Sequence, residues 1–163
     1  MRTKHLTDTQ KAYIAGFLDG DGSIFIQIVH RKDYRLKFQI RFSIVFFQKT
    51  EKKWFLLKLK KFLLHGSIRD RNDGMSEYAI VGLEQTVSVL HILSPYLSLK
   101  RKLATLLFEI AQKVRKIQTL EDLLHVCELV DTSARFTYSK KRTVTTDTVR
   151  KAHQHSGAVQ TES

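Results

Sequence analysis

The sequence predicts an α+β fold: an α-β-β-α-β-β-α unit with a four-stranded antiparallel sheet, helices on one of its faces, and further helices towards the C-terminus. Two patterns predict it. In several consecutive stretches apolar and polar residues alternate strictly, which is typical of strands with one buried face. Between and after these stretches, apolar residues recur every three to four positions, as in amphipathic helices. Helices on one side of such a sheet leave its other face bare.

The first half of the unit is a helix followed by two strands. A cap at Thr7 or Asp8 begins the helix, which ends in a glycine-rich turn at 20–22. The first strand is predicted at 24–31, and the second follows a polar loop at 36–47. The unbroken alternation in the second strand is the clearest secondary-structure signal of the chain.

The second half repeats the pattern with shorter strands. An amphipathic helix with a basic outer face covers 50–64, and a hairpin of 67–71 and 77–80 turns at Asn-Asp-Gly. The further helices are predicted at 83–93, at 99–116, from a capping box at 119–122 onward, and at 147–154. We expect a single domain over 1–154 and a disordered tail over 155–163.

The composition is that of a basic globular protein. Lys and Arg number 28 against 16 Asp and Glu, a formal net charge of +12. Such a charge favours a nucleic-acid partner, although a ribosomal or membrane-surface protein would share it. No apolar run reaches the roughly 20 residues that span a bilayer, so no membrane partner is expected. The single cysteine, Cys127, lies on an apolar helix face, which favours a buried thiol over a nucleophile.

The first helix has a face of small residues. Ala12, Gly16 and Gly20 are four positions apart and therefore share one side of the helix. An interior helical glycine costs about 1 kcal/mol relative to alanine, so a packing reason is expected. A smooth face lets another backbone approach closely, and we expect a two-fold dimer in which two such faces meet.

The same helix ends in two acids, Asp19 and Asp21, where the negative end of the helix dipole disfavours them. A bound cation would resolve the conflict, and hard cations take oxygen ligands. The alternative is a glycine-rich cap that leads into an ordinary turn. Together with the small-residue face, the acids favour a site. Asp21, with the carbonyl of Gly20 beside it, is the candidate metal ligand, whereas Asp19 is interpreted as a capping or packing acid.

The bare sheet face carries side chains suited to reading bases. Arginine offers a bidentate fork for guanine and glutamine one for adenine, and a strand ribbon fits the major groove. The alternative is a solvated face, which would hold more Lys, Glu and Thr. The predicted outer positions are Gln27, Val29, Arg31, Gln39, Arg41, Ser43, Ser67, Arg69, Arg71 and Glu77. Loop residues expected to contact DNA as well are Tyr34, Ser139, Lys140 and Lys141, with the lysines on phosphates.

Residues 14–22 read Ile-Ala-Gly-Phe-Leu-Asp-Gly-Asp-Gly, which resembles the motif that names the LAGLIDADG homing endonucleases. A Gln-Lys-Thr-x-x-x-Trp stretch from Gln48 to Trp54, Arg-Asp-Arg at 69–71, and Leu99-Lys100 after Pro95 are similar to the single-motif, homodimeric branch of that family. The resemblance covers the chain to about residue 150.

The resemblance implies a site-specific homing endonuclease. A homodimer would cleave both strands of a long pseudo-palindromic DNA duplex by divalent-metal-dependent phosphodiester hydrolysis, with the paired sheets forming one saddle on the DNA. Mg²⁺ is the expected cofactor, and Mn²⁺ or Ca²⁺ would substitute for it in binding. No small-molecule substrate is expected. The implied location is an organelle, the chloroplast, and otherwise the cytoplasm.

Further catalytic residues are carried over by resemblance alone. Gln48 matches a position that helps to order the attacking water. Lys52 and Lys100 match basic residues near the scissile phosphate, with Lys100 assisting the nucleophile or oxyanion electrostatically. The family often has arginine at the position of Lys52, and lysine cannot make a bidentate contact. Glu77 stands where a shorter acid is common.

Other functions compete with this prediction. An RNA maturase for intron splicing, or a DNA-binding regulator that has lost cleavage, would keep the fold and the charge. RNA reading commonly uses exposed aromatic stacking, for which Phe25, Phe47 and Tyr34 would serve, but Arg and Gln dominate the outer positions. A structural protein of the translation machinery would not explain the acidic helix end.

Overall fold

The computed structural model describes residues 5–137 and 142–159. Its contacts divide the chain into two compact units, one formed by the residues up to 25 with 42–105, the other by 26–41 with the residues from 106 onward. The single domain expected over 1–154 stays a prediction. Each unit is described by itself.

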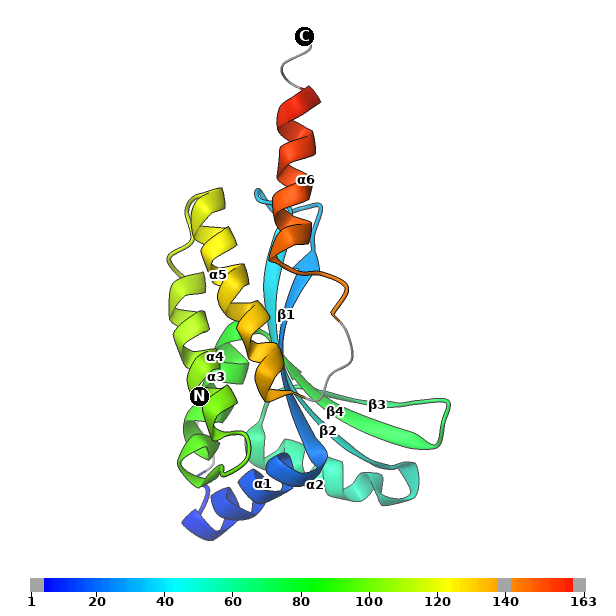
Figure 1. The fold of residues 1–163 in the computed structure, drawn as a ribbon. Helices are drawn as coiled ribbons and strands as arrows, with labels where there is room; N and C mark the ends of the chain where they lie inside the picture. Colours follow the sequence, from blue (N-terminus) through cyan, green and yellow to red (C-terminus); the bar gives the residue numbers. More distant parts are fainter. Residues whose placement is uncertain (1–4, 138–141, 160–163) are drawn as a thin grey trace. The chain divides into compact units, whose positions relative to one another are not determined.

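The elements follow the expected order, an α+β fold (Figure 1). The strands are β1 (Gly22–His30), β2 (Phe38–Lys49), β3 (Ser67–Asp70) and β4 (Met75–Val81). The helices are α1 (Asp8–Asp21), α2 (Lys53–Leu63), α3 (Leu83–Leu93), α4 (Arg101–Val114), α5 (Leu120–Thr132) and α6 (Thr146–Val159). Short 3-10 turns are η1 (Thr50–Lys52), η2 (Ser94–Tyr96) and η3 (Ser133–Phe136). The strands form one sheet in the order β1-β2-β4-β3.

A capping box begins α1. The Thr7 hydroxyl accepts the backbone N–H of Gln10 at 3.1 Å, and the Gln10 side chain accepts the N–H of Thr7 at 2.9 Å. Of the two caps that the sequence offered, Thr7 and not Asp8 is therefore the one used. The reciprocal bonds satisfy two of the donors that a helix start leaves open.

In the first unit, β4 pairs antiparallel with both β2 and β3. Tyr78 lies opposite Phe46 and Ile68, on the buried side of the sheet, and Glu77 lies opposite Phe47 and Arg69 on the other side. Because side chains alternate between faces, the register divides the strands into a core face and an outer face.

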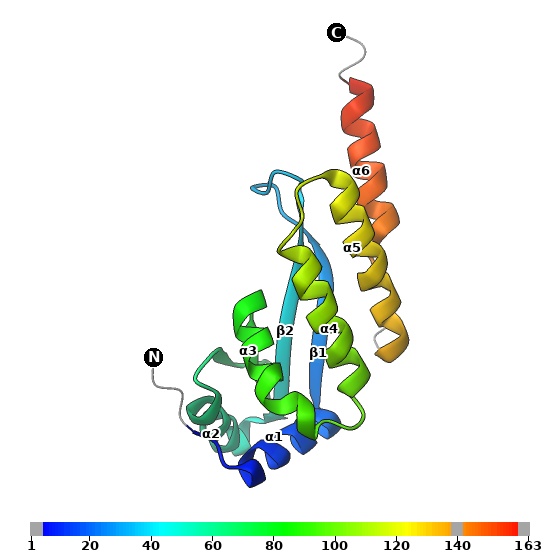
Figure 2. The same cartoon turned by 90° about the vertical axis from the view of Figure 1, so that its left-hand side faces the viewer.

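Helices α1, α2 and α3 group together in this unit (Figure 2). A row of aromatic rings runs through its core: Phe17 stacks on Phe46 at 5.9 Å between centroids, and Phe46 stacks on Tyr78 at 5.8 Å. The Tyr78 hydroxyl donates to the His65 carbonyl, which satisfies the polar end of a fully buried ring. Such packing makes α1 and the β2–β4 pair one rigid body.

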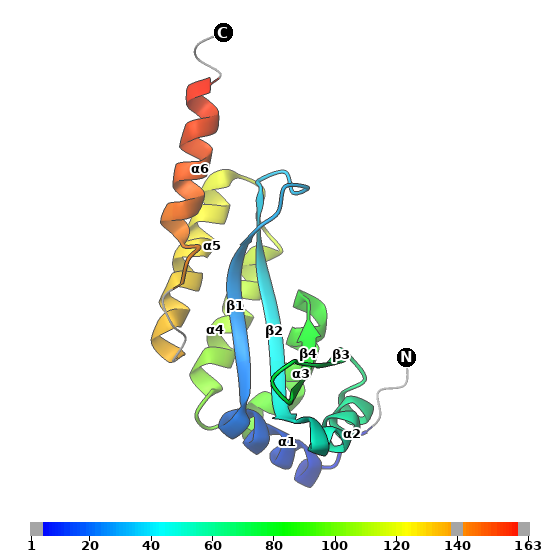
Figure 3. The same ribbon diagram turned by 90° about the vertical axis from the view of Figure 1, so that its right-hand side faces the viewer.

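The second unit holds α5 and α6, which pack side by side (Figure 3). A second capping box, of Thr119 with Asp122, begins α5 as the sequence predicted. Asp131 near the end of α5 accepts the N–H of Thr146 at 3.1 Å and its hydroxyl at 2.6 Å, which ties α6 to α5. The core of this unit includes Ile26, Ile28, Phe38, Ile40, Leu107, Ile110, Leu123, Val126, Val130 and Val149.

Several boundaries differ from the sequence prediction, and two of the differences have a structural explanation or consequence. The second strand begins at Phe38 and not at 36, because Lys37 has a φ of +66°, outside strand geometry. The last helix continues through His155 to Val159, into the tail that we expected to be disordered. Ion pairs of Asp147 with Arg150 and Lys151 support its first turns.

Cys127 is fully buried, as predicted, and burial raises the pKa of its thiol to about 12. A thiol with so high a pKa is almost entirely protonated at neutral pH, which makes it a poor nucleophile. Within the described residues, no helix is both long and apolar enough to cross a membrane.

Candidate active site and nucleic-acid interface

The end of α1 presents an exposed carboxylate. The helix ends at Asp21, and the N–H of Gly22 donates to the Leu18 carbonyl before the chain enters β1. A Cβ on Gly22 would lie 2.7 Å from Leu18 Cδ1, so only glycine fits this tight turn. The turn leaves Gly20 and Asp21 on the surface.

Asp19 points the other way and fixes the chain before α4. Its carboxylate accepts the backbone N–H of Ser98 at 2.7 Å and that of Lys100 at 2.9 Å. The Lys100 ammonium in turn donates to the main-chain carbonyl of Asp19 at 2.7 Å. The interpretation of Asp19 as a capping acid agrees with these bonds. Three hydrogen bonds therefore hold Lys100 at the acidic end of α1.

The environment of Lys100 changes its acidity. Partial burial lowers the pKa of its ammonium below the ordinary lysine value, and the nearby carboxylates of Asp19 and Asp21 oppose that shift. Lys100 is thus held by Asp19 at the helix end that also carries the exposed carboxylate of Asp21. The catalytic roles of Asp21 and Lys100 stay predictions.

Gln48 and Lys52 occupy the junction of β2 and α2. The Gln48 side-chain oxygen accepts the N–H of Lys49 at 3.0 Å, and Lys52 is exposed at the end of η1. Within the part of the chain that the structure describes, no hydrogen bond joins either residue to Asp21 or Lys100. The structure places both residues at the ends of these elements, and their catalytic roles stay predictions.

A polar network braces this junction. The hydroxyls of Thr50 and Ser76 are 2.9 Å apart, Ser76 donates to Asp70 at 2.8 Å, and Lys53 donates to the same carboxylate at 3.1 Å. Ser76 lies directly opposite Gln48 in the β2–β4 pair. The network thus ties the start of α2 and the end of β3 to the strand position that carries Gln48.

The small-residue face of α1 is exposed. Ala12, Gly16 and Gly20 all lie on the surface, and a Cβ on either glycine would meet nothing within 4 Å. Tyr13, on the same side, is 64% exposed, and Trp54 of α2 is 63% exposed. Both rings contact Phe55, at 6.2 and 6.0 Å between centroids. Packing within the chain does not explain the two glycines, in contrast to Gly22.

In the second unit, the predicted base-reading residues lie on β1, β2 and the loop between them. Gln27, Arg41 and Tyr34 are exposed, and Val29 and Gln39 are partly exposed. Arg31 is the best connected of the group: it bonds to Asp33 and Gln39, and its guanidinium lies 5.1 Å from the centroid of the Tyr34 ring.

In the first unit, the corresponding residues lie on β2, β3 and β4. Arg69 is paired with Glu77 at 2.5 Å and Arg71 with Asp73 at 2.9 Å, and Ser67 is exposed. Ser43 differs, since only 5% of it is exposed. Alternation along one strand predicts the side of the sheet on which a residue lies but not how far that side chain is covered. Ser139, Lys140 and Lys141 lie outside the described residues.

The donor chemistry of the α1 end fits a hard cation. Asp21 offers a carboxylate and Gly20 a main-chain carbonyl, and Mg²⁺ takes such oxygens together with several waters. Within the described residues, no group of three or more His, Cys, Asp or Glu side chains converges on a metal position. One chain thus supplies a minority of the ligands, and waters, phosphates or a second chain would complete the shell.

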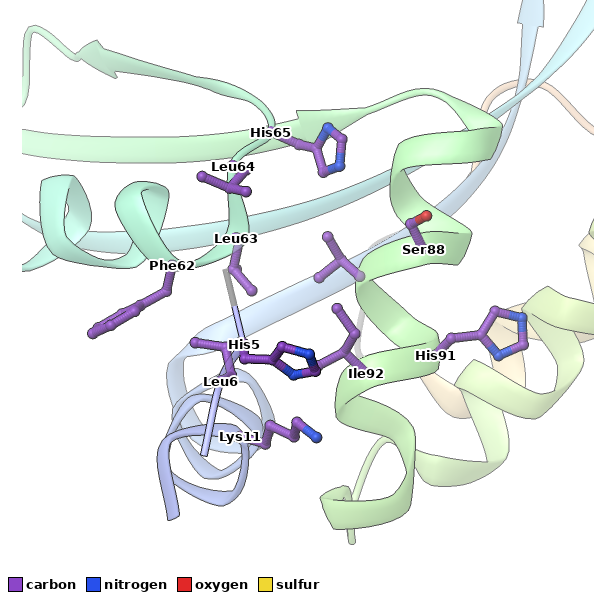
Figure 4. A pocket seen from close by; sticks show the side chains of 11 residues that line it. His5, Leu6, Lys11, Phe62, Leu63, Leu64, His65, Ser88, His91 and Ile92 are labelled. Carbon is purple, nitrogen blue, oxygen red and sulfur yellow. The ribbon is translucent and has the colours of Figure 1, made fainter. Parts of the chain in front are cut away.

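A cavity of about 400 Å³ lies between the start of α1, the end of α2 and α3 (Figure 4). Leu6, Leu63 and Ile92 form apolar parts of its wall, and His5 and His65 contribute rings. None of the predicted site residues lines it. The cavity is therefore separate from the acidic end of α1.

Some contacts at these sites had no signal in the sequence. Ser98 and Asp33 were not predicted as site residues, and the bracing role of Asp70 was also missed. Each acts through a partner that only the folded chain brings near, such as Asp19 for Ser98. Asp33 was visible in the sequence as a charge in a polar loop, but such a charge alone does not indicate an ion pair with Arg31.

The fold and the site define a class: a basic α+β protein with an outer sheet face rich in arginine and a carboxylate at a helix end beside a held lysine. The sequence profile of the LAGLIDADG endonuclease family matches residues 14–109. DNA endonuclease I-CvuI of Chlorella vulgaris is 41% identical over 148 residues, 91% of this chain and 92% of that protein. DNA endonuclease I-CreI of Chlamydomonas reinhardtii is 38% identical over 139 residues, 85% of each. The chain belongs to the LAGLIDADG endonuclease family.

Solved structures agree. The crystal structure of the homing endonuclease I-CvuI, in complex with its target in the presence of Ca, matches with a TM-score of 0.86 at 40% identity, over 91% of this chain and 95% of that one. The archaeal intron-encoded homing endonuclease I-Vdi141I, complexed with DNA, matches with a TM-score of 0.74 at 17% identity, over 87% and 92%. At 17% identity, the match to I-Vdi141I shows a shared fold and nothing more.

Proposed function

We propose that this protein is a site-specific homing endonuclease that cleaves both strands of a long pseudo-palindromic DNA duplex as a homodimer, using a divalent metal. The observation that carries the proposal is the exposed carboxylate of Asp21 at the same helix end where Asp19 holds Lys100. The net charge of +12 supplies attraction to the DNA backbone. Relatives that are 41% and 38% identical are DNA endonucleases.

Each residue of the site has a role in this proposal. Asp21 and the carbonyl of Gly20 hold Mg²⁺, or Mn²⁺ or Ca²⁺ in its place for binding. A bound divalent metal lowers the pKa of a water and neutralises charge on the phosphoryl oxygens. Gln48 orients the attacking water through its side-chain amide. Lys100 stabilises negative charge that develops on the phosphate, and Lys52 adds a second positive charge nearby.

The homodimer follows from the exposed face of α1. Ala12, Gly16 and Gly20 leave room for a backbone to approach, and the identical face of a second chain is the matching surface. The exposed rings of Tyr13 and Trp54 border this face and would lose contact with water in the dimer. Two acidic helix ends then lie side by side, one for each strand of the duplex.

The sheet face supplies sequence recognition. Arg31, Arg41, Arg69 and Arg71 are proposed to read base edges together with Gln27, Gln39 and Glu77, whereas Lys140 and Lys141 contact phosphates. Ser67, Val29 and Tyr34 complete the surface, and Ser139 lies beside the lysines. Ser43 is buried in this structure, so we propose that it contacts DNA only in a bound state that uncovers it. The curated relatives come from algae, and the chloroplast is the proposed location.

The target must be found directly and not taken from a relative. A structure of I-CvuI with the I-CreI target in the presence of 2 mM Mg reveals DNA that is not cleaved. The experiment is therefore a cleavage selection from a randomised duplex library with magnesium, calcium and EDTA lanes. With magnesium we expect cut duplexes that share one long, nearly palindromic sequence. With calcium we expect duplexes that are bound but not cut, and with EDTA neither cut nor bound duplexes. Selection of structured RNA and no duplex would favour the maturase alternative.

A further inference from the structure

We propose that Asp33 is a specificity-determining residue: together with Gln39 it holds the Arg31 guanidinium so that the remaining donors of Arg31 read one guanine. The inference rests on the proposed function, since it names how one part of the sheet face reads its target. It replaces the simpler expectation that Arg31 and Gln39 each read a base of their own.

The contacts are specific in geometry. Asp33 accepts from Arg31 Nε at 3.1 Å and from Nη2 at 3.0 Å, a bidentate pair along one side of the guanidinium plane. Gln39 Oε1 accepts from Nη1 at 3.1 Å. The Tyr34 ring lies 5.1 Å from the guanidinium carbon, within the range of a cation–π contact. Asp33, Gln39 and Tyr34, all of the second unit, thus hold the guanidinium plane of Arg31.

The donors that remain match a guanine. A guanidinium has five N–H groups, and these contacts occupy three of them, one on each nitrogen. One N–H on Nη1 and one on Nη2 are left. When Gln39 accepts the Nη1 hydrogen that faces Cδ, the two donors left over are parallel and fit the O6 and N7 acceptors of guanine in the major groove.

Gln39 loses its own reading pattern in the same arrangement. Bidentate recognition of adenine requires both the amide oxygen and the amide nitrogen of glutamine. The oxygen of Gln39 already accepts from Arg31, so its amide group has only donors to offer. Gln39 therefore acts here as a support for Arg31 and not as an adenine reader.

The loop that carries Asp33 is held in place before any DNA binds. Arg31 N–H donates to the Lys37 carbonyl at 2.8 Å, which closes the loop, and Tyr34 N–H donates to the Arg31 carbonyl at 3.1 Å. Arg35 donates to the Gln118 carbonyl, and His153 of α6 bonds to the Leu36 carbonyl at 2.8 Å. An ordered loop reduces the entropy that binding must overcome.

The other arginines of the outer face lack this support. Arg69 meets Glu77 and Arg71 meets Asp73, in each case through Nη2.

The ion pair of Arg31 with Asp33 shifts the pKa of both groups. The hydrogen bond with Arg31 lowers the pKa of Asp33, and the same bond raises the pKa of Arg31. Both groups stay charged throughout the pH range of a nuclease assay.

The test compares base preferences of variants in the full-length protein. Wild type, Arg31→Ala, Asp33→Asn and Gln39→Ala are each used to select bound duplexes from a randomised library in calcium, and the selected DNA is sequenced. Asp73→Asn is the matched control, an acid paired with Arg71 on the same face. Asp147→Asn, on α6, is a control for the loss of one exposed charge.

We expect Arg31→Ala to identify one position in each half-site where guanine is lost. At that same position Asp33→Asn should weaken the guanine preference by about tenfold, the scale of one bidentate base contact. Gln39→Ala should weaken it too and change no adenine position. Asp73→Asn should affect only other positions, and Asp147→Asn none.

Two results would overturn the inference while leaving the proposed function intact. One is a set of selections in which Arg31→Ala, compared with wild type, loses the preference for a guanine and Asp33→Asn keeps it. The other is a uniform loss of binding with Asp33→Asn, which would make the residue a general support. A wild-type protein that selects no sequence at all would instead contradict the proposed function, so the two failures are distinct.

Discussion

The ammonium of Lys100 donates a 2.7 Å hydrogen bond to the main-chain carbonyl of Asp19, while the Asp19 carboxylate accepts the Lys100 N–H at 2.9 Å. This reciprocal contact joins residues 81 positions apart and gives the two acids of the helix end different tasks. Asp19 organises the protein, and Asp21 remains exposed for a ligand.

Replacing Lys100 tests its electrostatic role. Lys100→Met should lower kcat by about 10²–10³-fold, the typical cost of losing one donor to a developing negative charge, and leave duplex binding in calcium nearly unchanged. Single-turnover cleavage and a gel-shift titration measure the two quantities. Lys102→Met, at an exposed lysine of α4, is the matched control and should cut normally. Equal losses in binding and cleavage would reassign Lys100 to phosphate contact.

Enlarging the small-residue face should separate the dimer. Gly16→Leu should leave the single chain folded, because a Cβ at Gly16 meets nothing within 4 Å, and an interior glycine costs about 1 kcal/mol of helix stability relative to alanine. Sedimentation should then find monomers where the wild type gives dimers. Gln112→Leu, at an exposed site on α4, should stay dimeric. A wild type that is monomeric even on DNA would contradict the proposed assembly.

The polar network at the β2–α2 junction has a pH signature. The hydrogen bond from Ser76, and then Lys53, lowers the pKa of Asp70 below its ordinary value of 3.8. The ionised form is thus favoured by folding, and its contribution is present above the unfolded-state pKa and lost as pH falls through the lowered one. Asp70→Asn should therefore have a lower Tm than wild type at pH 7, and the difference should vanish in acid.

The same variant should affect catalysis through Gln48. Loss of the Asp70 contacts frees Ser76, which lies opposite Gln48, so kcat should fall while calcium-dependent binding is kept. Asp147→Asn supplies the control for the cleavage and binding measurements. A Tm difference that persists unchanged at low pH would show that the carboxylate charge is not the cause.

The contact between α6 and the loop that joins β1 to β2, which carries Asp33, predicts a role for the C-terminal helix. The Leu36 carbonyl can only accept, so His153 donates its Nε2 hydrogen across 2.8 Å. His153→Ala should cost about 0.5–1.5 kcal/mol of stability and reduce discrimination at the position that Arg31 reads. His155→Ala, at an exposed position two residues on, should change neither. Unaltered discrimination with His153→Ala would separate α6 from recognition.

Strong local signals made most elements predictable. Alternation over six residue pairs indicated β2, and the capping box at Thr119 was readable as a short motif, whereas the sequence left the first cap open between Thr7 and Asp8. Features that depend on neighbouring strands were not. Ser43 has the spacing of an outer-face residue but is only 5% exposed.

The candidate site was less accessible to sequence reasoning. The small-residue face and the misplaced acids of α1 pointed to a partner and a cation, but Gln48, Lys52 and Lys100 stood out only through resemblance to a family. The reason is sequence distance: the bonds between Asp19 and Lys100 join residues 81 positions apart. The support of Arg31 by Gln39 arises in the same way from the pairing of neighbouring strands.

The central claim is tested most directly by cleavage of a selected duplex labelled on both strands, with wild type and Asp21→Asn in magnesium and in EDTA. We predict that wild type cuts both strands at one site in magnesium and neither in EDTA, whereas Asp21→Asn binds the duplex and cuts neither strand. Substantial cutting by Asp21→Asn, or wild-type cutting in EDTA, would contradict the account.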